Sequence, residues 1–148
     1  MRKLKAFVFS VAIIASGTAT AADPEAFVLS SKPPAYGMIP ASTIIYALML
    51  HQPCTRLIPN ANAMLAARLF NNLNHPERFD QGCWALTLDP SKAEVLVIGP
   101  TGHISTGMSL TQFTKATINA SGDGTAIGPA MTHAEFMKNL QDYEKSLR

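Results

Sequence analysis

Histidine, serine and carboxylate side chains are the groups in this 148-residue chain that could together carry out hydrolytic chemistry. His103 and Ser105 lie two positions apart, so on a β-strand they would share one face. A carboxylate such as Asp89 or Glu94 would complete the set of groups that activates a serine nucleophile. Such a triad depends on three-dimensional geometry, however, and we expect an ordinary solvent-facing sheet edge here.

The other histidines and the known sequence motifs do not indicate a metal or nucleotide site. Four histidines are dispersed along the chain, at His51, His75, His103 and His133. No two of them have helical ligand spacing, and none adjoins a carboxylate cluster. The chain also lacks Gly-x-Ser-x-Gly and Ser-x-x-Lys motifs and a phosphate-cradling loop. We therefore expect no enzyme active site, no metal and no cofactor.

The two cysteines, Cys54 and Cys83, have 28 residues between them. In an exported chain such a pair normally oxidises, and closing a loop of about 30 residues stabilises a fold by roughly 3.5 kcal/mol. A catalytic thiol with a histidine partner is the alternative, but no motif surrounds either cysteine. We predict a Cys54–Cys83 disulfide.

Residues 1–21 have the pattern of a secretory signal peptide. Three basic residues precede an apolar run from Ala6 to Ala15, and an Ala-x-Ala cleavage site ends at Ala21. About ten apolar residues are too few to cross a hydrocarbon core that needs about twenty. We expect cleavage after Ala21, a periplasmic or secreted location, and no membrane span in the mature chain.

Removing residues 1–21 changes the net charge. Three of the 12 Lys and Arg residues lie in that segment and none of the 10 acidic residues does, so nine basic residues face ten acidic ones. The mature net charge is therefore −1, and no Lys/Arg cluster remains. Nucleic acid is then a poor partner, and another exported protein is the partner we expect.

The stretch after Cys83 indicates three consecutive antiparallel strands, a β-meander. The strands are expected at 84–88, 94–98 and 103–106, with turns at 89–91 and 99–102. The second strand alternates apolar residues on both faces, so it should be covered on both sides. Trp84 follows Cys83 directly, and we expect its indole to pack on the disulfide rather than to form an exposed ligand platform.

Upstream of the meander the sequence predicts one irregular segment and one helix. Residues 22–40 contain four prolines, which favours an extended, poorly ordered segment. The apolar run 41–50 suits either a buried strand or a buried helix, and we favour the strand. Residues 60–74 have leucines at four-residue spacing, which predicts an amphipathic helix.

Downstream of the meander the sequence predicts a linker and a C-terminal helix. Ser109-x-x-Gln112 is a capping box for a short helix, and residues 119–131 suit a flexible linker. A second capping box at Thr132 opens an amphipathic helix over 132–148. Its apolar side contains the residues we expect to contact a partner: Phe136, Leu140 and Tyr143. Whether this helix docks on the sheet or stays free is left open.

The arrangement of Cys54, then Gly82-Cys83-Trp84, then strand, turn, strand and a closing Phe113 resembles small uncharacterised secreted bacterial proteins. The resemblance covers about 60 of the 127 mature residues, and Thr101 stands where that group commonly has Asp. It supports a fold and implies no chemistry.

Together these observations predict one α+β domain over 41–118: a small disulfide-pinned antiparallel β-meander packed with two or three helices. The expected function is that of an exported, non-enzymatic protein-binding or accessory module. The alternative is an inhibitor or immunity protein against a secreted hydrolase or toxin, which would project the turn at 99–103 into its target.

Overall fold

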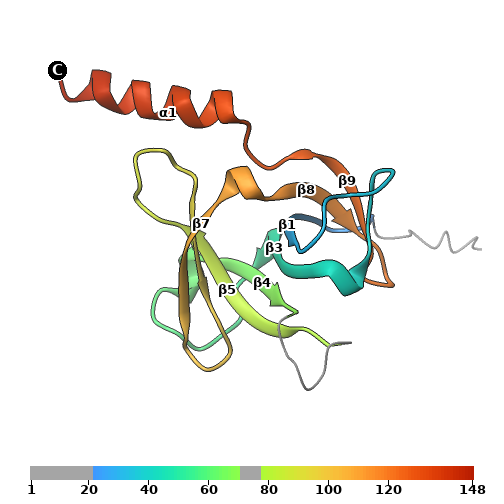
Figure 1. The fold of residues 1–148 in the computed structure, drawn as a ribbon. Coiled ribbons are helices and arrows are strands. Elements are labelled where there is room, and N and C mark those ends of the chain that lie inside the picture. Colours follow the sequence, from blue (N-terminus) through green and yellow to red (C-terminus); the bar gives the residue numbers. More distant parts are fainter. Residues whose placement is uncertain (1–21, 71–77) are drawn as a thin grey trace, which may run out of the picture.

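The computed structural model describes residues 22–70 and 78–148, which form one antiparallel sheet with the strand order β2-β9-β8-β1-β3-β4-β5-β6-β7 (Figure 1). The strands are β1 (Glu25–Ser30), β2 (Met38–Ile39), β3 (Ile44–Pro53), β4 (Leu65–Leu69), β5 (Asp80–Leu86), β6 (Glu94–Ile98), β7 (Ile104–Ser109), β8 (Thr114–Ile118) and β9 (Gly124–Pro129). Three 3₁₀ turns also occur, η1 (Ala41–Thr43), η2 (Ala61–Ala63) and η3 (Leu110–Gln112). The chain ends in helix α1 (His133–Ser146).

The sheet is coiled, because η3 joins strands from distant places in it. Six strand spacings separate β7 from β8, about 29 Å in a flat sheet. The chain from Ser109 to Thr114 can span at most about 18 Å. The sheet must therefore bend until the two strands approach. Leu110 N donates a hydrogen bond to Ala93 O at 2.8 Å, which continues the β6–β7 pairing into η3. Figure 1 shows β7 leading directly into β8.

Coiling encloses one face of the sheet as the inner core. Its buried residues come from β3 to β6 and from the η3 junction: Leu48, Ala67, Leu69, Trp84, Val95, Val97, Leu110 and Phe113. The Trp84 indole donates a hydrogen bond from Nε1 to Met49 O at 3.1 Å, and its ring meets Phe27 edge-on, 6.0 Å between centroids. These contacts orient a large aromatic side chain at the centre of the fold.

The outer face carries two separate clusters. One comprises Ala26, Val28, Ile39, Ile44, Ala47, Met49, Ala116 and Ile118, to which β2 contributes Ile39 and β9 the half-buried Ala126. The other surrounds the disulfide and contains Cys54, Met64 and Cys83. Apolar residues on both faces of the central strands explain why their sequences are nearly continuous hydrophobic runs.

The meander, the disulfide and the strand at 41–50 are confirmed. β5, β6 and β7 pair as consecutive antiparallel strands, Cys54 is bonded to Cys83, and β3 covers most of the apolar run. Lys92 N donates to Asp89 O at 2.9 Å and Gly102 N to Gly99 O at 3.1 Å, which closes the two expected turns. Both capping boxes are formed as well.

The poorly ordered segment predicted for 22–40 is wrong. β1 lies between β8 and β3, and its Ala26 and Val28 are buried in the outer cluster. Pro33 and Pro34 lie in the 31–37 connection, which is a turn held by Ala35 and Met38. The six residues before it form β1, which pairs with two strands. The domain therefore begins well before residue 41.

The helix predicted for 60–74 is also wrong over its described part. Residues 65–69 form β4, with Ala67 and Leu69 in the inner core; residues 71–74 lie outside the described part. A four-residue spacing places side chains on one face of a helix and also on one face of a strand. The leucine pattern therefore did not distinguish the two.

Three further expectations need correction. The linker at 119–131 contains β9, which pairs with β8 and, through Thr125 and Gly124, with β2. Among the described residues α1 is the one α-helix, so two or three helices are not present there. Trp84 does not pack on the disulfide, because neighbouring strand residues point to opposite faces and its ring lies in the inner core.

Candidate functional site

Helix α1 begins at a complete capping box, which explains its abrupt start after β9. Thr132 Oγ1 accepts a hydrogen bond from Glu135 N at 3.2 Å, and Thr132 N donates to Glu135 Oε2 at 2.7 Å. The hydrogen bonds from the Thr132 backbone and hydroxyl lower the pKa of Glu135, because they favour its ionised form. The negative charge also complements the positive end of the helix dipole.

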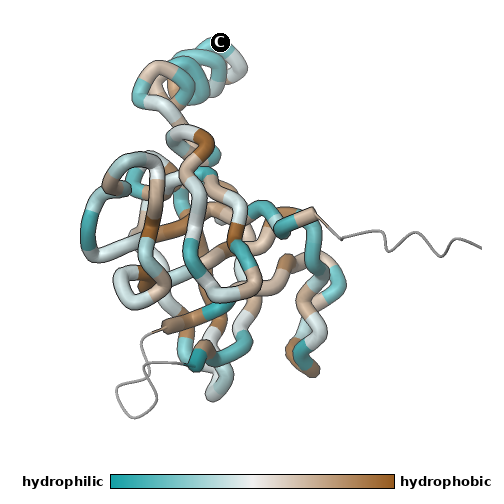
Figure 2. Tube along the Cα trace, turned by 90° about the vertical axis from the view of Figure 1, so that its right-hand side faces the viewer, coloured by the Kyte–Doolittle hydropathy of each residue, from teal (hydrophilic) through white to brown (hydrophobic). Residues whose placement is uncertain are grey.

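Helix α1 projects from the coiled sheet instead of covering it. Figure 1 and the perpendicular view in Figure 2 both show it set apart from the strands, and none of its residues is buried. Among described residues, one hydrogen bond joins it to the strand body: Asn139 Nδ2 donates to Ser91 O at 2.7 Å. The sequence left open whether this helix docks or stays free; it projects from the sheet, and its contacts with the strand body are near its start and at Asn139.

The three residues expected to contact a partner differ in exposure. Phe136 and Leu140 are half-buried, and Phe136 borders a hollow of about 260 Å³ beside Met108. Tyr143 is 45% exposed, and Leu147 beyond it is 69% exposed. The apolar side of α1 thus begins near the sheet and continues into solvent.

A groove separates the outer half of α1 from the loop between β5 and β6. We call it the helix–loop groove; its volume is about 430 Å³, and it is lined by Thr87, Leu88, Asp89, Pro90, Lys92, Asn139, Asp142, Tyr143 and Ser146. Leu88 is fully exposed, and with Pro90 it supplies the apolar groups of the loop side. Tyr143 supplies the aromatic group of the helix side.

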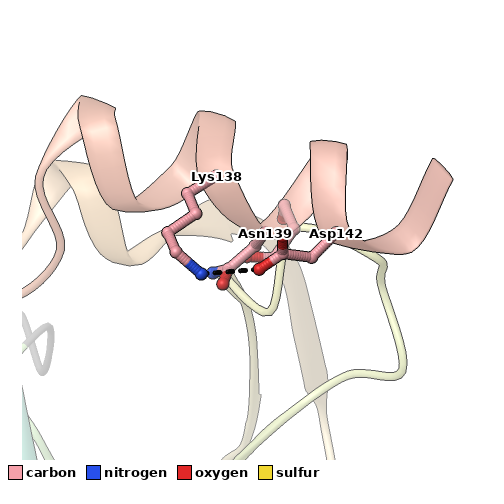
Figure 3. Close-up of polar contacts among 4 residues, drawn as sticks. Lys138, Asn139 and Asp142 are labelled. Carbon is pink, nitrogen blue, oxygen red and sulfur yellow. Dashed lines mark hydrogen bonds and ion pairs between the residues drawn. The ribbon is translucent and has the colours of Figure 1, made fainter. Parts of the chain in front are cut away.

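Charged residues of α1 flank this groove. Lys138 Nζ donates to Asp142 Oδ2 at 2.6 Å, and Figure 3 shows both side chains on the side of the helix that carries Asn139. This hydrogen bond lowers the pKa of Asp142 and raises that of Lys138, and the charge of Lys92 across the groove adds to the effect on Asp142. The lining of the groove therefore combines apolar groups with the charged side chains of Asp89, Lys92 and Asp142.

Side-chain hydrogen bonds within the loop hold the loop side of the groove. Asp89 Oδ1 accepts hydrogen bonds from Ser91 N at 2.9 Å and from the Ser91 hydroxyl. Thr87 Oγ1 donates to Glu94 Oε2 at 2.8 Å at the base of the loop. Leu88, which the strand expected at 84–88 included, lies beyond the end of β5 and is exposed at the groove.

The catalytic set considered for His103 and Ser105 is not assembled. Asp89 and Glu94 are engaged in the loop just described, and Glu94 pairs with Ser109, about 13 Å along β7 from Ser105. The structure instead places Asp80 and Tyr46 beside His103 and Ser105 around a hollow of about 240 Å³. No hydrogen bond joins the described Asp80, His103 and Ser105.

Two other expectations concern metals and membranes. Residues 22–70 and 78–148 contain no group of three or more His, Cys, Asp or Glu side chains that could hold a metal ion, and His75 lies outside these ranges. With 14 residues, α1 is too short to cross a membrane, and no other helix of the described chain is long and apolar enough. The signal peptide expected at 1–21 lies outside the described residues and stays a prediction.

The sequence missed the loop side of the groove and the proximity of Asp80 to His103. Both depend on contacts between strands and on the position of α1, for which no local pattern exists. The one available signal was Leu88, an apolar residue immediately before the Asp89-Pro90 turn. Comparisons of the chain with protein-family models, with curated proteins and with solved structures found no match.

Proposed function

We propose that this protein is an exported, non-enzymatic protein-binding or accessory module that engages its partner through α1 and the helix–loop groove. The observation that carries the proposal is the apolar side of α1, which extends beyond the sheet and leaves Tyr143 and Leu147 exposed to solvent. When a partner covers apolar groups on a projecting helix and removes them from water, the complex is stabilised.

A protein fits this surface better than a small molecule does. Helix α1 is about 21 Å long, and its apolar residues are spread along it rather than gathered in one enclosed site. The groove adds Leu88 and Pro90 from a second element, together with the charged Asp89, Lys92 and Asp142. Protein interfaces usually combine apolar contacts with polar and charged groups.

Export is supported by one coarser observation. The Cys54–Cys83 disulfide is typical of proteins in oxidising compartments. Cleavage after Ala21 would leave three residues ahead of β1, so the mature chain would retain every described strand.

Site-specific photo-crosslinking in the exporting cell tests the contact surface. A photoreactive phenylalanine analogue at Tyr143 or Leu147 should give an adduct with one defined protein. The matched control is the same analogue at Gln141, an exposed position of α1 outside the apolar side. Equal adducts at all three positions, or none at Tyr143 and Leu147, would contradict the proposed surface.

The alternative, an inhibitor or immunity protein, is favoured by the rigidity of the 99–103 turn. Gly99 N donates to His103 O at 2.8 Å, and Arg56 Nη2 donates to Pro100 O at 2.5 Å, so the turn is braced from outside. A preorganised exposed turn loses little entropy when it enters a cleft. The photoreactive analogue at Thr101 distinguishes the two functions: an adduct with a hydrolase or toxin there, and none from Tyr143, would favour inhibition.

A further inference from the structure

We propose that a pocket at the opposite end of β9 from α1 binds a small organic carboxylate whose remaining part is apolar or aromatic. The pocket has a volume of about 430 Å³, and the side chains that matter for recognition are Ser42, Arg68, Phe70, Phe79, Asn119 and Ser121. We call it the Arg68 pocket. It shares no lining residue with the helix–loop groove, and the inference does not depend on the proposed function.

Arg68 is directed to this pocket by the alternation of β4. Ala67 and Leu69 enter the inner core, so Arg68 emerges on the outer face together with Phe70. Its guanidinium carbon lies 4.9 Å from the centroid of the Phe79 ring, and the Phe70 and Phe79 rings are 5.7 Å apart. The cation is thus stacked on an aromatic surface.

The charge of Arg68 has no counterion among the described residues. No carboxylate lies within ion-pair distance of it there, and partial burial lowers the pKa of Arg68 because desolvation disfavours the charged form. A partly desolvated cation that borders an open pocket gains most from an anion that enters that pocket.

The other polar groups of the pocket are neutral and include hydrogen-bond donors. Asn119 Oδ1 accepts from Ser121 N at 2.9 Å and Asp123 N at 3.0 Å, so the amide nitrogen is the remaining group of that side chain. The neighbouring carboxylate of Asp123 is engaged by Ala41 N at 2.8 Å. The hydroxyls of Ser42 and Ser121 complete a set of donors that suits carboxylate oxygens.

The aromatic wall specifies the rest of the ligand. Phe79 is 40% exposed, and with Phe70 it offers an apolar surface directly beside the guanidinium. A carboxylate on a ring or short alkyl chain would pair with Arg68 through two parallel hydrogen bonds while its apolar part covers the phenylalanines. The pocket volume lies in the range of small-molecule sites.

Titration of the full mature protein with benzoate, followed by amide and arginine Nε resonances, tests the proposal. We expect saturable shifts at Arg68 Nε and at the Asn119 amide. Acetate, which lacks the ring, and benzyl alcohol, which lacks the charge, should each bind roughly tenfold more weakly or worse. Benzyl alcohol binding as tightly as benzoate, or no saturable shift with benzoate, would overturn the proposal.

Variants distinguish benzoate binding in the Arg68 pocket from nonspecific attraction to positive charge. Arg68→Gln should weaken benzoate binding by roughly tenfold or more, whereas Arg148→Gln, the same change at an exposed arginine, should leave it unaltered. If Arg68→Gln fails to fold, Phe79→Leu changes the partly exposed wall instead and should weaken benzoate more than acetate. Unchanged benzoate affinity in the folded variant of either residue contradicts the inference.

Discussion

Cys83 and Trp84 are neighbours in β5 that stabilise opposite faces of the sheet. Cys83 is fully buried in the outer cluster around the disulfide, while Trp84 lies in the inner core and donates a hydrogen bond to Met49 O. Because side chains alternate along a strand, two adjacent residues stabilise different clusters, the disulfide cluster and the inner core. Substitutions at these two positions should affect different clusters.

Replacing Cys54 with Ser should lower the free energy of unfolding by about 3 kcal/mol. The disulfide closes a loop with a sequence separation of 29, and its loss restores entropy to the unfolded chain. Denaturant unfolding measures the change, and the Cys54→Ser/Cys83→Ser double variant should resemble the single one. An unchanged midpoint would show that the disulfide contributes nothing.

Replacing Gly82 of β5 with alanine tests how closely the strands pack. In Gly82→Ala the added methyl would overlap Ile98 O and approach Leu69 Cδ1 to 2.7 Å, so we expect a loss of at least about 1–3 kcal/mol. Gly128→Ala is the matched control, because nothing lies within 4 Å of its added methyl. Thermal unfolding of both variants should therefore separate them clearly; equal stabilities would contradict the packing described.

The capping carboxylate should make the start of α1 sensitive to acid. The pKa of Glu135 is lowered from its ordinary value of 4.5, so its stabilising effect is complete above pH 4.5 and is lost as pH falls through the lowered pKa. The Thr132 amide resonance should report this loss on acidification. Glu135→Gln retains an acceptor oxygen but does not titrate there, so a titration that persists in this variant must come from another group.

At the scale of elements, α1 and β9 differ in how strongly they belong to the fold. β9 pairs with β8 and β2, and the residues that follow it, Ala130 and Met131, still pack on the inner core. Helix α1 begins immediately afterwards and contributes no buried residue. The boundary between core and projection thus falls between Met131 and Thr132.

Deletion of residues 132–148 should leave the sheet folded. The truncated chain retains Met131 and loses one hydrogen bond between α1 and the strand body, from Asn139 to Ser91, so we expect stability to change by less than about 1 kcal/mol. Thermal unfolding measures this stability. In the truncated chain, a photoreactive residue placed in the loop of the groove, for example at Leu88, should no longer give an adduct with the partner. A truncated chain that does not fold would show that α1 belongs to the core.

At the scale of the whole molecule, the coiled sheet separates two surfaces. β9 begins beside the Arg68 pocket and ends shortly before α1, so the pocket and the start of α1 lie at opposite ends of one strand. The disulfide and the outer cluster lie on the same face of the sheet as Arg68, so both stabilise the part of the sheet that carries the Arg68 pocket.

The exported protein should begin at Ala22. The basic, apolar and Ala-x-Ala segments of residues 1–21 predict cleavage there, and β1 starts at Glu25, close behind. Intact mass of protein recovered from the exporting cell should equal residues 22–148 less the two hydrogens lost in disulfide formation. A chain that retains Met1 in the membrane fraction would contradict this processing.

By itself the sequence determined the features that depend on neighbouring residues. The two turns of the meander and the two capping boxes are formed by groups a few positions apart, so their local patterns were sufficient. The disulfide was determined as well, because only two cysteines exist to pair.

The tertiary structure alone decided β1, β4, β9 and both candidate sites. Helix propensities differ by only a few tenths of a kcal/mol per residue, so burial of Ala67 and Leu69 and hydrogen bonds to β3 and β5 outweigh the helical preference of 65–69. The groove and the Arg68 pocket join residues more than 40 positions apart, for example Leu88 with Tyr143 and Arg68 with Asn119. Their proximity follows from the coiling of the sheet, because strands distant in sequence meet only when that coil forms.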